Sequence, residues 1–126
     1  MFKKFNAHPK KKRVGDCVKR AICTAEERDY RQVTNELNAL KRSIGAEKFD
    51  NPVVWKNYIK EKEYEKLSFP AEKGKKRMNR QRFMKQFKKG NYILRMAGHL
   101  SCCVNGDILD TYDCTGKCVY TAWKVK

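Results

Sequence analysis

The sequence predicts an α+β fold, with helices in most of the first ninety residues and strands in the remainder. Apolar residues recur at intervals of three and four up to Phe87, which is helical spacing, and they alternate after Gly90, which is strand spacing. Segregation of the two patterns along the chain is typical of α+β domains. The 126 residues suit one domain with a modest core, and no internal repeat or Gly/Ser linker divides them.

Capping residues indicate where the helices begin and end. Asp16 and Asp29 stand as N-caps before apolar stripes, and we expect the second of these helices to end near Gly45. The pair Asn51–Pro52 opens a third helix, with proline in its first turn. A short fourth helix is expected over residues 79–89.

Four short runs with strand periodicity follow the helices. We expect them to form the successive strands of an antiparallel meander, at residues 91–97, 99–104, 107–112 and 118–123. One earlier segment, residues 63–69, fits a short strand and irregular chain equally well.

The dipeptide Asn105–Gly106 is a strong signal for a hairpin with a two-residue type I′ turn. That loop pairs Ser101 with Asp110 across the two strands. His99 then lies on the same face as Asp110, as its diagonal neighbour, close enough for a hydrogen bond. Asp113 falls on the opposite face, so the geometry selects Asp110 as the partner of His99.

Cys17 is the candidate nucleophile that a histidine–aspartate pair requires. An imidazole held by a carboxylate through one ring nitrogen presents the other nitrogen as a base. Cys17 is expected at the start of a helix, where the positive end of the helix dipole stabilises a thiolate. Cys17, His99 and Asp110 therefore form a candidate nucleophile, base and orienting group.

Three segments carry a resemblance to a known family: "GDCVKRAICTA", "DYRQVTNEL" and "YILRMAGHLSCCVNGDILDTYD". They resemble small phage-encoded proteins of papain-like fold, distantly similar to the cysteine peptidases that trim double-glycine leaders. The pattern runs through residues 14–123. The resemblance implies a papain-like cysteine peptidase fold, in which the Cys17 helix packs on a C-terminal antiparallel sheet. It also implies a Cys17–His99–Asp110 triad of peptidase, isopeptidase or amidase type, acting through an acyl-enzyme.

The chain departs from the papain-like pattern at the oxyanion hole. These peptidases usually place a glutamine a few residues before the nucleophile, whereas residues 10–16 contain neither Gln nor Asn. The Cys17 backbone N–H can supply one donor, and Asn6 or a basic side chain is the candidate for the second. Loss of one such donor typically costs on the order of 10²–10³ in rate.

Each of these residues also has a non-catalytic explanation. Free cysteine is among the most buried residue types, and a sheet histidine is more often structural than catalytic. Asp110 also has Ser101 and Tyr112 as hydrogen-bond donors in reach. A structural zinc site is a weaker alternative, because neighbouring strand residues face opposite ways; its ligands would be His99, Cys102, Cys103, Cys114 and Cys118. We therefore expect no metal and no cofactor.

The composition bounds location and partners. No apolar run approaches the roughly 18 residues that span a bilayer, and the basic lead-in, residues 1–13, lacks the apolar core of a secretory signal. We expect this lead-in to be loose at its start, ahead of one domain over residues 14–126. The six cysteines are then free thiols in the cytoplasm, the host's cytoplasm if the protein is phage-encoded.

The net charge of +16 favours anionic partners. Nine Lys and Arg residues and no acid lie between residues 73 and 89, a segment that by default is a solvated face. The candidate contacts to an anion or to nucleic acid are Lys73, Lys75, Lys76, Arg77, Arg80 and Arg82. The expected partner is a protein or peptide substrate, an acidic one being among the candidates, and not a membrane. The alternative function is a non-catalytic basic protein that binds a host protein, or nucleic acid without sequence preference.

Overall fold

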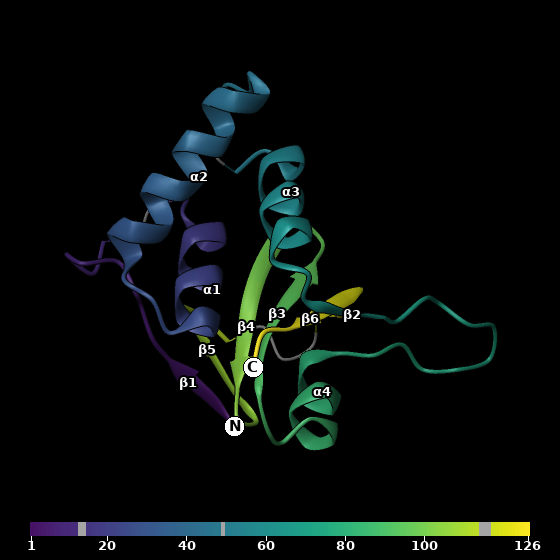
Figure 1. Cartoon of the computed structure of the whole chain (residues 1–126). Coiled ribbons are helices and arrows are strands. Elements are labelled where there is room, and N and C mark those ends of the chain that lie inside the picture. The colour runs from purple at the N-terminus through teal and green to yellow at the C-terminus, as the bar shows by residue number, and fades with distance from the viewer. Residues whose placement is uncertain (13–14, 49, 114–116) are drawn as a thin grey trace.

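The computed structural model describes residues 1–12, 15–48, 50–113 and 117–126. Over these residues the chain is an α+β fold of four helices and a six-stranded mixed sheet (Figure 1). The helices are α1 (Cys17–Glu26), α2 (Tyr30–Ile44), α3 (Pro52–Lys62) and α4 (Arg80–Gln86). The strands are β1 (Phe2–Lys4), β2 (Glu65–Ser68), β3 (Asn91–Met96), β4 (His99–Val104), β5 (Asp107–Asp110) and β6 (Thr121–Lys124). Their order across the sheet is β1-β5-β4-β3-β6-β2.

Local capping places the helices α2 and α3 where the sequence predicts them. The Asp29 side chain accepts a hydrogen bond from the Gln32 backbone N–H at 3.3 Å, and α2 ends at Gly45 in the left-handed conformation. The Asn51 side chain accepts from the Val53 N–H at 3.0 Å, which opens α3. These contacts satisfy backbone groups that a helix end leaves without a partner.

Helix α4 is shorter than expected, because it ends at Gln86 and not at residue 89. Phe87 leaves the helix with φ −111°, and its ring stacks on that of Phe83 with centroids 4.5 Å apart. Gly90 then turns the chain into β3 with φ +93°. A side chain there would meet the Lys126 carbonyl oxygen, since an added Cβ would lie 2.6 Å from it.

The sheet differs from the expected meander at both of its edges. Strands β3, β4 and β5 are successive antiparallel neighbours as predicted, but β6 pairs with β3 and not with β5. Three of the four residues of β6 are buried, on both faces, so this strand lies inside the sheet between β3 and β2. The prediction of a loose start to the lead-in was wrong, because β1 pairs in parallel with β5. That pairing covers the edge of β5 and makes the sheet mixed.

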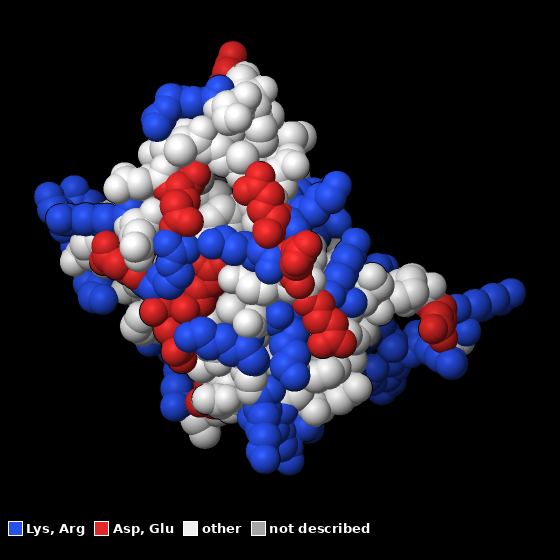
Figure 2. Space-filling model, viewed as in Figure 1, with Lys and Arg blue, Asp and Glu red and all other residues white. Residues whose placement is uncertain are grey.

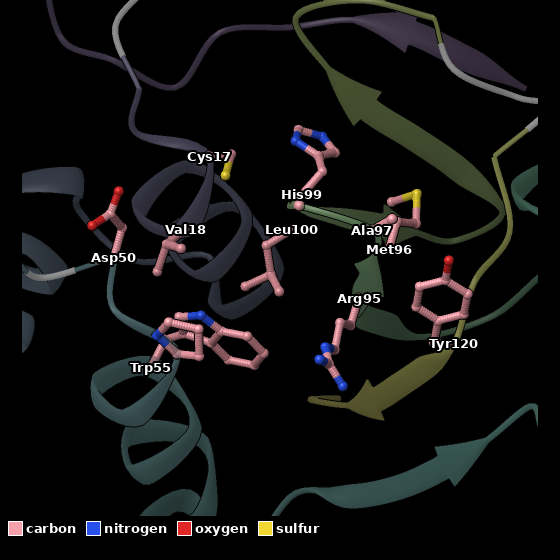
Figure 3. Close-up of a pocket in the computed structure, with 12 residues that line it drawn as sticks. Cys17, Val18, Asp50, Trp55, Arg95, Met96, Ala97, His99, Leu100 and Tyr120 are labelled. Carbon is pink, nitrogen blue, oxygen red and sulfur yellow. The ribbon is translucent and has the colours of Figure 1, made fainter.

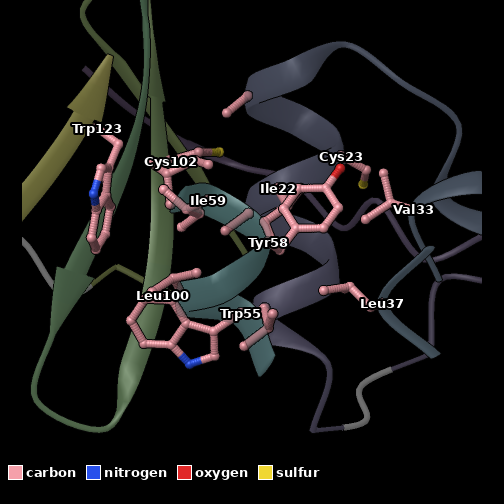
Figure 4. Packing of buried hydrophobic residues seen from close by; sticks show 14 of the residues in the cluster. Ile22, Cys23, Val33, Leu37, Trp55, Tyr58, Ile59, Leu100, Cys102 and Trp123 are labelled. Atoms are coloured by element: carbon pink, nitrogen blue, oxygen red, sulfur yellow. The ribbon is translucent and has the colours of Figure 1, made fainter. Parts of the chain in front are cut away.

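Helices cover both faces of the sheet. On one face α1, α2 and α3 pack with Leu100, Cys102 and Trp123 of the sheet (Figure 4). On the other face Phe83 and Met84 of α4 pack with a second set of strand residues. That set includes Leu94, Met96, Cys103 and Ile108. The alternation of side chains along β4 thus separates neighbouring residues into two cores.

Charged groups of both signs cover the view in Figure 2, with Lys and Arg in excess. The segment between β2 and α4 projects from the body of the molecule (Figure 1). No helix in the described part of the chain is both long enough and apolar enough to cross a bilayer.

Candidate active site

Cys17 is the first residue of α1, and a buried ionic contact fixes the residue before it. Asp16 accepts a hydrogen bond from the Tyr30 hydroxyl at 2.7 Å and also pairs with Arg20. Its carboxylate makes no capping bond to the helix, and it is almost fully buried. The start of α1 is therefore held by side-chain contacts to the second turn and to α2, which fixes the position of the half-buried Cys17.

The β4–β5 hairpin places His99 against Asp110. Its turn has positive φ at both central residues, 48° at Asn105 and 83° at Gly106, as a type I′ turn requires. The register pairs Cys103 with Ile108, in agreement with the register expected from the sequence. His99 Nε2 lies 2.8 Å from Asp110 Oδ2, so the predicted hydrogen bond between them is confirmed.

The His99 ring is hydrogen-bonded to both Asp110 and Cys17. Figure 3 shows the His99 ring beside the Cys17 sulfur. Its Nε2 is engaged with Asp110, which leaves Nδ1 as the nitrogen for the hydrogen bond with the Cys17 sulfur. His99 is the first residue of β4, so its ring reaches the helix α1 around the end of the strand. A ring held in this way presents one nitrogen to the thiol in a fixed tautomer.

The electrostatics of the pair favour the charged forms of both groups. Burial would raise the pKa of the Cys17 thiol, but hydrogen bonds from His99 and from the Leu100 backbone N–H lower it below its ordinary value. Burial would likewise lower the pKa of His99, but the hydrogen bonds to Asp110 and to Cys17 raise it to about 9. The two shifts therefore favour a thiolate and an imidazolium over the neutral thiol and imidazole.

Asp110 is held by more donors than the sequence predicts. Its Oδ2 accepts from Ser101 Oγ at 2.6 Å and from Arg80 Nη1 at 3.3 Å, and its Oδ1 accepts from the Thr111 N–H at 2.7 Å. Burial would raise the pKa of this carboxyl, but the hydrogen bonds from His99 and Ser101 lower it. The carboxylate is thus fixed in orientation and kept ionised.

Arg80 is the site residue that the sequence interpretation misplaced. We expected it on the surface as an anion contact, but its side chain is 0 % exposed and lies against Asp110 and Ser101. Arg80 is buried because of helical periodicity. It shares the inner face of α4 with Phe83 and Met84, three and four residues further on. That spacing was visible in the sequence, behind the run of basic residues.

Cys17 and His99 form part of the wall of a pocket of about 240 Å³ (Figure 3). Apolar side chains make much of this wall, including Trp55 and Leu100, while Arg95 and Tyr120 line it from the sheet side. The pocket is partly open to the surface. Its remaining lining residues are Val18, Asp50, Pro52, Met96, Ala97 and Gly98.

Asn6 does not serve as the second oxyanion donor in this arrangement. Its amide nitrogen donates to the Lys12 carbonyl oxygen at 2.9 Å, and its Oδ1 accepts from the His8 N–H at 3.0 Å. Both polar atoms of the amide are engaged within the lead-in. The Cys17 backbone N–H, at the first position of α1, remains the candidate donor that the helix geometry supplies.

The remaining basic candidates lie in and beside the projecting segment. Lys73, Lys75, Lys76 and Arg77 are exposed, and Lys75 pairs with the neighbouring Glu72 at 3.0 Å. The guanidinium carbon of Arg77 lies 4.5 Å from the centre of the Tyr120 ring, at the pocket wall. Arg82 is half-buried and bonds the Arg77 carbonyl oxygen at 3.4 Å.

The cysteines of the proposed zinc alternative do not converge. Cys102 and Cys103 belong to the two separate cores on opposite faces of the sheet, as their neighbouring positions in β4 predict. Cys118 is half-buried in the loop before β6, and Cys114 lies outside the described residues. Among the residues that the structure places, no group of three or more His, Cys, Asp or Glu has an arrangement that could hold a metal ion.

Comparison of the chain with protein-family models, with curated proteins and with solved structures finds no match. The arguments for function therefore come from the site itself.

Proposed function

We propose that this protein is a papain-like cysteine hydrolase, a peptidase, isopeptidase or amidase, which acts through Cys17, His99 and Asp110. The observation that carries the proposal is the double contact of His99, to the Asp110 carboxylate through Nε2 and to the Cys17 thiol, at the wall of an open pocket. The order of the three residues along the chain and the resemblance to phage-encoded proteins of this fold support it. In this proposal the protein acts in the cytoplasm.

The geometry suits an acyl-transfer reaction in two steps. The Cys17 thiolate attacks the amide carbonyl carbon, the C–N bond breaks, and His99 gives its proton to the leaving amine. A water molecule then attacks the resulting thioester while His99 accepts a proton from it, and the thiolate leaves. Asp110 orients His99 and stabilises its charged form throughout. Attack by another amine in place of water would transfer the acyl group with the same residues.

The first test is the rate at which iodoacetamide alkylates Cys17 as a function of pH, in the wild type and in His99→Ala. Mass spectrometry of the digested protein assigns the adduct to its cysteine, with the half-buried Cys118 as an internal reference. We expect fast alkylation of Cys17 well below pH 8 that is lost in the variant. A profile typical of an ordinary thiol, with pKa near ~8.5 and unchanged by the substitution, would contradict the proposal.

A second candidate function is binding of nucleic acid by the projecting segment. The observation that favours it is the exposure of Lys73, Lys75, Lys76 and Arg77 on a segment that stands away from the body of the molecule. Such contacts release counterions, so binding to a mixed-sequence oligonucleotide should weaken steeply with salt. Changing all four residues to Gln should reduce the salt slope, whereas Cys17→Ser should leave it unchanged. An unchanged slope in the fourfold variant would contradict this second function.

A further inference from the structure

Arg95 lies on the wall of the pocket that also holds Cys17 and His99. It belongs to β3, where its register partners are Leu100 of β4 and Thr121 of β6. Its side chain is half-buried and points to the face of the sheet that α1 and α3 cover, where Figure 3 shows it below Leu100 and near Trp55. A guanidinium is thus placed in the same cavity as the nucleophile.

No described residue offers Arg95 a carboxylate within ion-pairing distance. Two other half-buried arginines do have carboxylate partners: Arg20 pairs with Asp16, and Arg28 pairs with Glu26 and Glu36. Asp50 also lines the pocket, but it lies on the side of Cys17 and Val18, away from Arg95 in Figure 3. A partly desolvated cation without a carboxylate partner gains more from an anionic ligand than a fully exposed cation does.

Further positive charge lies beside Arg95, in a second cavity that does not include Cys17. This second cavity, of about 410 Å³, shares Arg95 as a wall residue. Its other charged lining residues are Lys56, Lys60, Lys66 and Glu63, so cations outnumber acids there by four to one when Arg95 is included. Arg95 is thus a wall residue of both cavities, with Cys17 and His99 in the first and an excess of lysines in the second.

We propose that Arg95 is a specificity-determining residue, which binds a carboxylate of the substrate on one side of the bond that Cys17 attacks. The preferred substrates are then peptides with an acidic residue close to the scissile amide. The guanidinium offers a planar pair of donors that matches a carboxylate. This inference rests on the proposed hydrolase function, of which it names the substrate class.

The test uses peptide-like alkylating probes that need no turnover. We would compare bromoacetyl-(Gly)n-glutamic acid α-amide with its isosteric glutamine amide, over a short series of glycine spacers. Each probe alkylates the thiolate, forms a thioether and releases bromide. A third series, bromoacetyl-(Gly)n-glutamine with a free terminal carboxylate, separates recognition of a side-chain carboxylate from recognition of a chain terminus.

We expect the glutamate probe to react with Cys17 faster than the glutamine probe at the best spacer length, by roughly fivefold at low salt. Arg95→Gln should bring this ratio close to one, and Arg95→Lys should retain most of it. The matched control is Arg42→Gln, which removes the same charge from an exposed position near the end of α2. The control should keep the wild-type ratio.

Two results would overturn the proposal. One is a ratio near one at every spacer length in the wild type. The other is an equal loss of rate for all probes in Arg95→Gln, which would assign Arg95 a structural role. Because the ratio compares two probes on the same thiol, it can be measured at high pH even if Cys17 proves to be an ordinary thiol. Failure of the hydrolase proposal therefore appears in the pH profile, and failure of this inference appears in the ratio.

Discussion

At the scale of single residues, the candidate site depends on the hydrogen bonds and ion pairs that the buried Asp110 carboxylate makes. Three side chains converge on the same Asp110 oxygen, at 2.6 Å for Ser101, 2.8 Å for His99 and 3.3 Å for Arg80. A buried carboxylate is tolerated only when it is paired and hydrogen-bonded, and breaking such a pair costs more than the pair contributes. Arg80 is therefore expected to anchor Asp110, and through it the ring of His99.

Replacing Arg80 should test this anchoring. We expect Arg80→Met to lower the free energy of unfolding by about 3 kcal/mol, because it removes a buried cation from the Asp110 carboxylate and leaves His99 and Ser101 as its side-chain partners. Chemical denaturation monitored by tryptophan fluorescence measures the change. Arg82→Met is the matched control, since Arg82 is half-buried on the same helix and its side chain bonds the Arg77 carbonyl oxygen at 3.4 Å, with no carboxylate partner among the described residues. Equal losses in the two variants would show that Arg80 has no special role, and Arg80→Lys should recover part of the loss if the charge matters.

At the scale of elements, the β4–β5 turn decides which residues face each other. Gly106 has φ +83°, and a Cβ added there would lie 3.4 Å from Lys88 Cα. We expect Gly106→Ala to destabilise the fold by about 1–2 kcal/mol, because an L side chain in the left-handed region is strained. The midpoint of urea unfolding gives the value. Gly15→Ala is the control, since Gly15 has no positive φ and no atom within 4 Å of an added Cβ, and it should lose no stability. If Gly15→Ala lost as much stability as Gly106→Ala, the loss at Gly106 could not be attributed to the geometry of the turn.

The elements that could be predicted are those that local chemistry determines. Asp29, Gly45 and Asn51 act on backbone groups within a few residues of themselves, so both ends of α2 and the start of α3 followed from the sequence. The turn at residues 105–106 is equally local. It sets the register that makes His99 the diagonal neighbour of Asp110, and this could be predicted without the rest of the fold. The Cys17 thiol at the start of α1 completed the candidate site by the same kind of argument.

The features that escaped prediction are pairings between distant parts of the chain. Strand β6 returns to β3 from the end of the chain, and β1 reaches β5 across more than a hundred residues. The two-residue alternation identifies a strand but not its neighbour. Arg80 escaped for a different reason, because the surrounding basic residues concealed its place on the apolar face of α4.

At the scale of the whole molecule, ionisable groups fall into two populations with different effects on stability. Most of the 30 Lys and Arg residues are exposed, where ion pairs contribute little and salt screens them. A few groups are buried within contacts, such as Glu26, which accepts from the Tyr58 hydroxyl at 2.8 Å. In the candidate site the pKa values of Cys17 and His99 are shifted in opposite directions, downward for the thiol and upward for the imidazole.

Both pKa shifts stabilise the folded protein, but the two contributions change with pH in opposite directions. The raised pKa of His99 gives a contribution that is present below its unfolded value of 6.5 and lost as pH rises through about 9. The lowered pKa of Cys17 gives a contribution that is present above its unfolded value of 9.0 and lost as pH falls through its folded value. At a pH above the folded pKa of Cys17 and below that of His99, the folded pair is thiolate and imidazolium. Between the unfolded values of 6.5 and 9.0 the unfolded pair is thiol and imidazole. Both pairs bind one proton, so the two dependences cancel.

Removing the Cys17 thiol should make the pH dependence of stability that comes from His99 measurable. In Cys17→Ser the bond to Asp110 still raises the pKa of His99, so the folded state binds one proton more than the unfolded state. The free energy of unfolding, relative to wild type, should then fall as pH rises above about 6.5, by at most about 1.4 kcal/mol per pH unit. The fall should stop once pH passes the folded pKa of His99, which is lower in the variant because Cys17 no longer raises it. Urea titrations at several pH values measure the difference, in which all other titrating groups cancel. Cys118→Ser should run parallel to wild type, and a Cys17→Ser profile that also ran parallel would mean that His99 carries no extra proton in the folded protein.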